Sequence, residues 1–108
     1  MKHYRVVMAA EGEEDLLDIH DYVSEHDALG NAEALLHKLE AKCASLAGFP
    51  NRGRVAPELA RIGVLGFREI FCKPYRVIYQ VRKAEGYLHC VLDGRRDLQD
   101  LLQRRLLR

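Results

Sequence analysis

Four arginines in the second half of the chain are the residues whose type best suits chemistry on an anion. Arg68 and Arg76 lie on predicted strands, and Arg95 and Arg96 follow Gly94, where the last predicted strand ends. A guanidinium group presents a planar fork of donors that fits phosphate and carboxylate oxygens. On adjacent antiparallel strands these side chains would converge into one cationic patch, so all four are candidate binding residues.

A structural role is the alternative for the same arginines. Each could form an ion pair with Glu69, Asp93 or Asp97, or with the acidic stretch near the N-terminus. That stretch, residues 11–15, suits the first turn of a helix, where negative charge meets the positive end of the helix dipole. Residue types alone leave the binding role and the structural role open.

No other pattern in the chain predicts a catalytic or metal site. The sequence has no Gly-rich phosphate loop, no CxxC pair, no HExxH and no nucleophile elbow. The histidines do not cluster in the sequence. We interpret His20 as a core residue, and we favour a structural role for His89 over that of a general base. We therefore expect no metal and no cofactor.

Composition is typical of one soluble domain spanning residues 1–108, with 48% hydrophobic and 31% charged residues. No apolar run approaches the roughly 18–20 residues of a membrane span, and no secretory signal is visible. The three cysteines are odd in number and widely spaced, which fits no disulfide framework and favours a reducing cytoplasm.

The formal net charge of +1 hides an asymmetry between the two halves of the chain. Residues 1–51 hold four Lys/Arg and ten Asp/Glu, a balance of −6, and residues 52–108 hold thirteen and six, a balance of +7. A basic half suggests an acidic partner surface. The alternative is that the two halves lie together and neutralise each other.

The first half of the chain predicts a strand and an antiparallel helical hairpin. The apolar run His3–Ala9 is typical of a strand, and apolar residues recur at helical spacing over Glu11–Glu25 and again as far as Leu46. Asp27, with Asn31 as the alternative, is the expected N-cap of the second helix. The apolar seam of such a hairpin needs a flat surface to cover, and a sheet is the candidate.

The stretch from Phe67 to Asp97 predicts the rest of that sheet. Alternating residues indicate three antiparallel strands, with Leu65, Phe67 and Phe71 on one face and Leu88, Cys90 and Leu92 together on another. The fold class is α+β: an N-terminal strand, a helical hairpin, a three-stranded meander and a short C-terminal helix. The predicted segments are a connecting loop at Asn51–Gly63, with a turn of helix at Pro57–Ile62, strands at Val64–Phe71, Tyr75–Val81 and Tyr87–Asp93, and a helix at Leu98–Leu107 capped by Asp97.

These segments resemble the RelE/ParE superfamily of bacterial toxins. The resemblance rests on FREIF, KPYRVIY, DGRRDLQ and LLQRRL, covers the chain from Tyr4 to its end, and is closest to the ParE branch. It implies the toxin of a type II toxin–antitoxin system, cytoplasmic, that inhibits DNA gyrase. It also implies a cognate antitoxin with a ribbon-helix-helix start, a toxin–antitoxin hetero-oligomer, and no direct DNA binding by the toxin alone.

A ribosome-dependent mRNA endonuclease of the RelE type is the alternative within the same superfamily. The resemblance places Arg76 and Arg96 at the positions that stabilise the scissile phosphate, with Arg68 near another basic position. The tyrosine that assists proton transfer in those nucleases falls at Leu102 in this chain. The charge-stabilising half of that chemistry is present and the proton-moving half is absent, which favours a protein target. A non-toxic binding module of the same fold is the third possibility.

Overall fold

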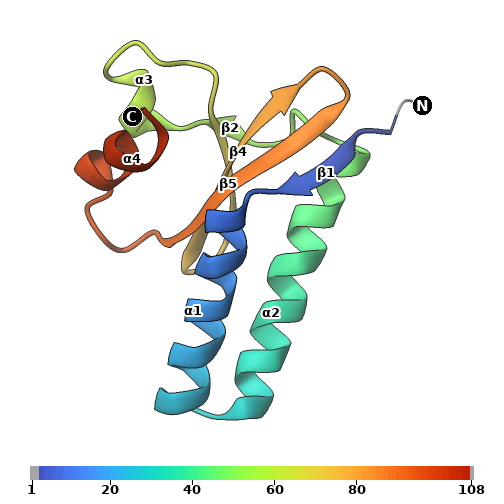
Figure 1. Ribbon diagram of the computed structural model, residues 1–108, viewed down its shortest axis with the longest axis vertical. Helices are drawn as coiled ribbons and strands as arrows, with labels where there is room; N and C mark the ends of the chain where they lie inside the picture. The colour runs from blue at the N-terminus through green and yellow to red at the C-terminus, as the bar shows by residue number, and fades with distance from the viewer. Residues whose placement is uncertain (1–2, 108) are drawn as a thin grey trace.

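A five-stranded sheet lies between two helical layers in this protein (Figure 1). The computed structural model describes residues 3–107. The elements follow the chain as β1 (Arg5–Met8), α1 (Ala10–His26), α2 (Leu29–Ala44), the 3-10 turn η1 (Ser45–Ala47), β2 (Arg54–Val55), α3 (Pro57–Ala60), β3 (Arg68–Cys72), β4 (Tyr75–Arg82), β5 (Glu85–Asp93) and α4 (Gln99–Leu106).

The sheet has the strand order β1-β5-β4-β3-β2. β3, β4 and β5 form the predicted antiparallel meander, and β1 joins it by pairing in parallel with β5. The α+β class and the order of strand, hairpin, meander and helix are therefore confirmed. No helix within residues 3–107 has the length and apolarity needed to cross a membrane.

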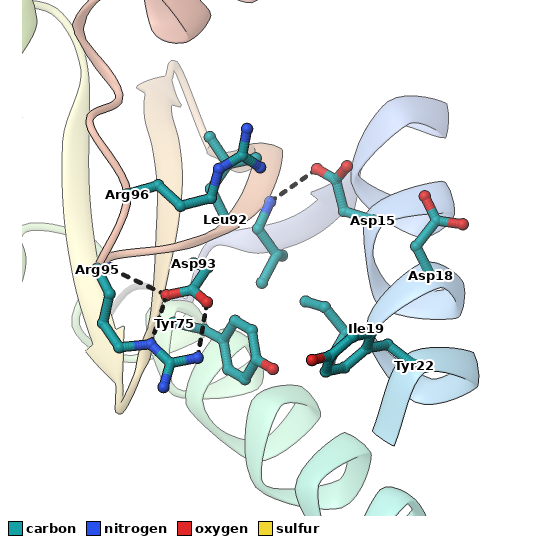
Figure 2. Close-up of a pocket in the computed structure, with 10 residues that line it drawn as sticks. Asp15, Asp18, Ile19, Tyr22, Tyr75, Leu92, Asp93, Arg95 and Arg96 are labelled. Atoms are coloured by element: carbon teal, nitrogen blue, oxygen red, sulfur yellow. Dashed lines mark hydrogen bonds and ion pairs between the residues drawn. The ribbon is translucent and has the colours of Figure 1, made fainter. Parts of the chain in front are cut away.

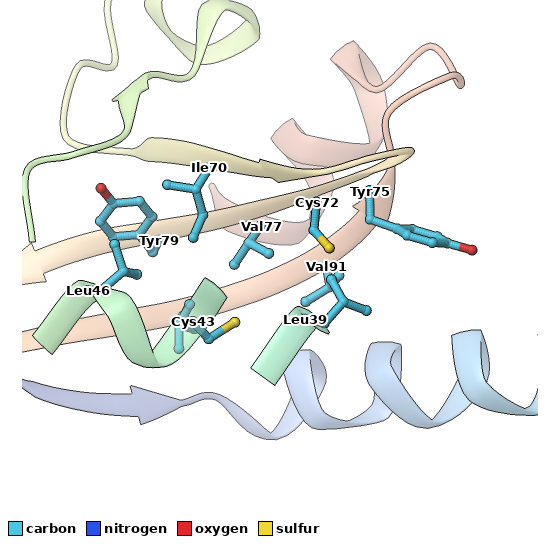
Figure 3. Packing of buried hydrophobic residues seen from close by; sticks show 10 residues of the cluster. Leu39, Cys43, Leu46, Ile70, Cys72, Tyr75, Val77, Tyr79 and Val91 are labelled. Carbon is cyan, nitrogen blue, oxygen red and sulfur yellow. The ribbon is translucent and has the colours of Figure 1, made fainter. Parts of the chain in front are cut away.

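The helical hairpin covers one face of the sheet, as predicted. Leu39, Cys43 and Leu46 pack against inward-facing residues of β3, β4 and β5, including Val77 and Tyr79 (Figure 3). Helix α1 lies close to β5 because Gly12 has no side chain there. A Cβ atom at Gly12 would lie 3.3 Å from the carbonyl oxygen of His89 and only 2.6 Å from Met8 Sδ.

The opposite face of the sheet is covered by α3 and α4. Leu59, Leu98 and Leu102 are almost fully buried against Ile78 and Cys90 of the sheet. The prediction that Asn51–Gly63 is a solvated loop is therefore wrong in part. It holds the predicted helical turn as α3, and it also forms β2, whose Arg54 pairs with Glu69 of β3.

A bulge in β5 corrects the predicted faces of that strand. The register shifts between Ile78 and Tyr79, so that Leu88 pairs with Tyr79 while Cys90 pairs with Ile78. His89 is the extra residue. Because a bulge interrupts the strict alternation of side chains, Leu88 faces the hairpin whereas Cys90 and Leu92 face α4.

The face predicted for the strand at Val64–Phe71 is also wrong in part. Of its three large apolar residues only Phe67 is buried, and Leu65 and Phe71 are 65% and 43% exposed. Leu65 precedes β3, which begins at Arg68, and Phe71 lies beyond the two residues that β2 covers. Both lie outside the apolar cluster beneath α3 and α4, and Phe71 is covered in part by the Arg54 guanidinium, which lies 5.2 Å from the centre of its ring.

The helix ends show a second kind of correction. Asp27 does not cap α2; its backbone N–H donates to Val23 O at 2.8 Å and so ends α1, and its carboxylate accepts from Asn31 Nδ2. Asp97 lies one residue before the N-cap position of α4, which Leu98 occupies, yet it still bonds the start of that helix. Its Oδ1 accepts from the backbone N–H of Gln99, the first residue of α4, at 3.1 Å.

Candidate functional site

Arg76 lies inside the molecule and not on its surface. Strand β4 points its side chain to the face covered by α3 and α4, and only 6% of the residue is exposed. Its Nη1 and Nη2 each donate to a different oxygen of Glu58 at 2.7 Å, and its Nε donates to Glu69 Oε1 at 2.8 Å. Nη2 also contacts Glu69 Oε1. All three nitrogens of the guanidinium group are thus bonded to carboxylates.

This pairing shifts the pKa values of both partners in the directions that favour charge. The hydrogen bonds from Arg76 hold the pKa of Glu58 below its usual value, against the opposing effect of burial. The hydrogen bonds to Glu58, and then those to Glu69, raise the pKa of Arg76 despite its burial. Arg76 thus stays charged and neutralised, which is the structural role left open above.

Glu69 is buried on the same face of the sheet as Arg76. Its carboxylate is held by Arg76 on one side and by Arg54 Nε, at 2.6 Å, on the other. Because a buried carboxylate needs charged or hydrogen-bonding partners, Glu69 can occupy an otherwise apolar face only between these two arginines.

Arg68 points to the other face of the sheet. It pairs in register with Tyr79, and its Nη1 donates to the carbonyl oxygen of Gly53 at 2.7 Å. The Tyr79 hydroxyl in turn donates to Pro50 O and accepts from Gly53 N. Arg68 therefore helps to fix the loop before β2. Arg68 and Arg76 lie on opposite faces and do not converge.

Arg95 and Arg96 are exposed on the loop between β5 and α4. Arg95 forms a two-atom ion pair with Asp93, which lowers the pKa of that carboxyl to about 2. Arg96 forms no ion pair with any residue in the range 3–107; only its backbone N–H is bonded, to Asp93 O at 3.3 Å. Of the four predicted residues, these two lie together and face solvent.

The two arginines form one wall of a cavity of about 380 Å³ between α1 and the end of β5 (Figure 2). Asp15 and Asp18 of α1 form the opposite wall. The floor of the cavity is apolar and aromatic and consists of Ile19, Tyr22, Tyr75, Val91 and Leu92. The cavity thus offers cations, carboxylates and rings at its surface, a mixture that suits a polypeptide segment.

Apart from Arg95 and Arg96, the residues that line this cavity were not among the predicted site residues. Tyr22 is 60% exposed on α1, whereas Tyr75 is buried at the start of β4, and burial raises the pKa of its hydroxyl. Asp15 has a structural task as well, since its Oδ2 accepts from Val91 N at 2.9 Å. An aromatic residue at an exposed helix position, as Tyr22 is, was the available signal in the sequence.

Neither Leu102 nor His89 is suited to move a proton. Leu102 is completely buried in the apolar cluster beneath α4. His89 is half-buried, its Nε2 lies 2.8 Å from Gln80 Oε1, and burial together with nearby Arg82 lowers its pKa to about 4. Within residues 3–107 no group of three His, Cys, Asp or Glu side chains could hold a metal ion.

The chain is similar to known proteins in sequence and in fold. The model of the family described as "ParE toxin of type II toxin-antitoxin system, parDE" matches residues 4–98 of this chain. Among solved structures, a chain of the "Chromosomal ParDE TA system from P. aeruginosa" superposes with a TM-score of 0.71 at 16% sequence identity, over 84% of this chain and 96% of that one. At that identity the likeness concerns the fold. No curated protein sequence matches this chain.

Proposed function

We propose that this chain, which belongs to the ParE toxin family of type II toxin–antitoxin systems, acts by binding and inhibiting DNA gyrase and does not cut RNA. The observation that carries the proposal is that Arg76 is buried and bonded to carboxylates within the protein. An arginine that stabilises a scissile phosphate must meet that phosphate in the transition state. Arg76 is buried and already bonded to Glu58 and Glu69.

The missing acid–base group supports the same conclusion. General acid–base catalysis needs a titratable side chain within hydrogen-bond reach of the reacting atoms. Leu102 stands where the nucleases of this superfamily are expected to have a tyrosine, and it is buried. A toxin without this group can still act by holding its target.

Arg95 and Arg96 are the residues that we propose for contact with the target. Both are exposed, and the cavity beside them offers apolar surface for an anchoring side chain. Interface arginines next to aromatic rings often contribute much of the binding energy. Arg68 and Arg76, candidates by sequence, are held by internal bonds and are left with positioning roles in this proposal.

A cognate antitoxin is the second partner of a toxin of this family. We propose that its tail lies along the groove between the helical hairpin and the sheet, in the cytoplasm, and that the two proteins form a hetero-oligomer. The groove between α1 and β5 fits this role because its floor is apolar and its rim carries Arg95 and Arg96. Acidic residues of the tail would pair with Arg95 and Arg96, while its basic or apolar residues would face Asp15 and Asp18 on the opposite wall.

A paired assay tests the target. The purified protein is added to a DNA gyrase supercoiling reaction and to a translation reaction in which mRNA cleavage is followed. We expect inhibited supercoiling and intact mRNA. Cleaved mRNA with unaffected gyrase would overturn the proposal in favour of the nuclease, and no response in either reaction would favour a non-toxic binding module.

The variant Arg95→Ala/Arg96→Ala sharpens the same assay. We expect it to lose gyrase inhibition by roughly tenfold or more, the effect of removing interface contacts that contribute at least 1.4 kcal/mol. Arg104→Ala is the matched control, because Arg104 is exposed on α4 outside the cavity. Equal loss in both variants would contradict the assignment of the contact surface.

A further inference from the structure

The outer edge of β3 is open where β2 ends. β2 pairs with β3 only at Arg54–Glu69 and Val55–Arg68, so Ile70–Cys72 has a neighbouring strand, β4, on one side only. Before β2, the backbone of Gly53 is held by side chains and does not extend the pairing with β3, because its N–H donates to the Tyr79 hydroxyl and its carbonyl oxygen accepts from Arg68 Nη1. An open edge presents unpaired backbone donors and acceptors that can bind another strand.

Basic side chains gather on both sides of this edge. One cavity of about 330 Å³ is lined by Lys42, Arg52, Arg54 and the β3 residues Ile70 and Phe71. A second, of about 370 Å³, continues along α2 and shares Lys42 and Arg52 with the first. We call this continuous surface the β3-edge groove, and its cations are Lys38, Lys42, Arg52 and Arg54.

The groove holds a net positive charge that the molecule does not neutralise. Glu69 is the one carboxylate that lines either cavity, and it is already bonded to Arg54 and Arg76. Lys42 forms no ion pair with residues 3–107, and the Arg52 side chain donates only to the Ser45 hydroxyl within that range, at 2.6 Å. Anions are thus attracted to this edge, whereas a second copy of the same basic edge is repelled.

An apolar anchor lies in the same place. Phe71 is 43% exposed on β3, and the Arg54 guanidinium lies 5.2 Å from the centre of its ring. Ile70 and Cys72 point the other way, toward α2 (Figure 3). A strand added beside β3 would alternate its side chains between Phe71 and Arg54 on one face and Lys42 and Arg52 on the other.

We propose that the β3-edge groove binds an extended acidic polypeptide segment, which adds to the sheet as a further strand beside Ile70–Cys72. A polypeptide is favoured over a nucleic acid because it supplies backbone partners for the open edge as well as negative charge. The groove lies beside α2 and β3, away from the cavity of Arg95 and Arg96, so the proposal does not depend on gyrase being the target.

Three synthetic peptides test this proposal by titration into the whole protein, with backbone amide shifts as the readout. The first alternates glutamate with valine over ten residues, the second has lysine for glutamate, and the third is the acidic peptide with alternate amides N-methylated. We expect only the first to bind, with the largest shifts at Ile70–Cys72. Equal binding of the methylated peptide would show a simple anion site and overturn the proposal.

Two protein variants complete the test. Arg52→Glu should lower the affinity for the acidic peptide by roughly tenfold or more, since it replaces attraction by repulsion within the groove. Arg104→Glu makes the same change of charge on α4 and should leave the affinity within twofold. An acidic peptide that does not bind, or whose affinity Arg52→Glu leaves unchanged, would overturn the proposal, as would equal binding of a single-stranded oligonucleotide of the same charge.

Discussion

At the scale of single residues, Arg76 shows how tertiary contacts decide the meaning of a charge. Its position on a strand suits anion binding, yet α3 brings Glu58 to it and β3 brings Glu69. Gly94 has a part in this arrangement, because a Cβ there would lie 3.0 Å from Arg76 Cγ and Cδ. Arg76 thus joins α3, β3 and β4 from within.

Arg76→Ala should therefore destabilise the fold. Removing one member of a buried ion pair leaves an uncompensated charge and costs about 3–5 kcal/mol, a large share of the roughly 5–15 kcal/mol that stabilises a typical protein. Urea unfolding followed by circular dichroism measures the loss. Arg96→Ala, on an exposed arginine, should stay within about 0.5 kcal/mol of the parent.

A compensating variant tests the cause of that loss. Glu69→Gln removes the buried negative charge, so Arg76→Met/Glu69→Gln should recover part of the stability that Arg76→Met loses alone. Glu69→Gln is therefore measured both in the parent and in Arg76→Met. If it lowers the stability of both proteins by the same amount, then the two residues act independently and the ion-pair explanation is wrong.

At the scale of elements, α4 is the one that depends most on charge to hold its place. Its eight residues bury Leu102, while Arg105 donates to Glu11 at 2.9 Å and to Asp15 at 3.0 Å across the molecule. Short helices are marginal by propensity alone. The acidic first turn of α1 thus serves α4 as well as its own helix dipole.

Arg105→Gln should loosen α4 without unfolding the rest of the protein. Arg105 and its partners are partly exposed, so we expect a loss of roughly 1–2 kcal/mol, between the values for surface and buried pairs. Hydrogen–deuterium exchange should rise over residues 99–106 and stay constant over β4. Arg104→Gln, one residue earlier, is the control, and equal exchange in both variants would contradict this role.

At the scale of the whole molecule, the acidic and basic halves of the chain only partly neutralise each other. Arg105 pairs with Glu11 and Asp15, and Arg5 contacts Glu85, so charge does cross between the halves. Arg96 and the cations of the β3-edge groove stay without acidic partners in the described structure, Arg54 excepted. The two halves therefore neutralise each other in part, and an acidic partner for the remaining basic surface stays a prediction.

Burial of His89 gives the whole molecule an acid response. Its folded pKa of about 4 lies below the ordinary histidine value of 6.5, so the unfolded chain binds the proton first as pH falls. The stability that neutral His89 contributes is complete above pH 6.5 and is lost as pH falls toward 4. Glu58, whose folded pKa is also lowered, adds a further loss only below its unfolded value of 4.5.

Thermal melting between pH 7.5 and 5 checks this window. The parent should lose stability steadily below pH 6.5, whereas His89→Gln should show a flatter profile from pH 6.5 to 5, because glutamine does not titrate. The carboxylates of both proteins titrate alike, so they cancel in the comparison. Parallel profiles would mean that His89 has no part in the acid response.

The sequence by itself determined the fold class, the helical hairpin, the meander and the family. These follow from local signals: apolar residues at helical spacing, alternation in Tyr75–Val81, and the residues between them that break each element. The alternation in β4 was predicted correctly because no extra residue interrupts that strand, whereas the extra residue His89 lies in β5. The bond from Asp97 to the start of α4 is local as well, since it acts on an amide two residues away.

Only the tertiary structure decided which arginines face solvent. Pairing of Arg76 with Glu58 and Glu69 joins residues 18 and 7 positions apart, and the bulge at His89 depends on register between two strands. Neither leaves a periodic signal in the chain. The sequence predicted that the four arginines form one patch. In the structure, Arg68 and Arg76 point to opposite faces of the sheet and bond to other parts of the protein, whereas Arg95 and Arg96 lie together and face solvent.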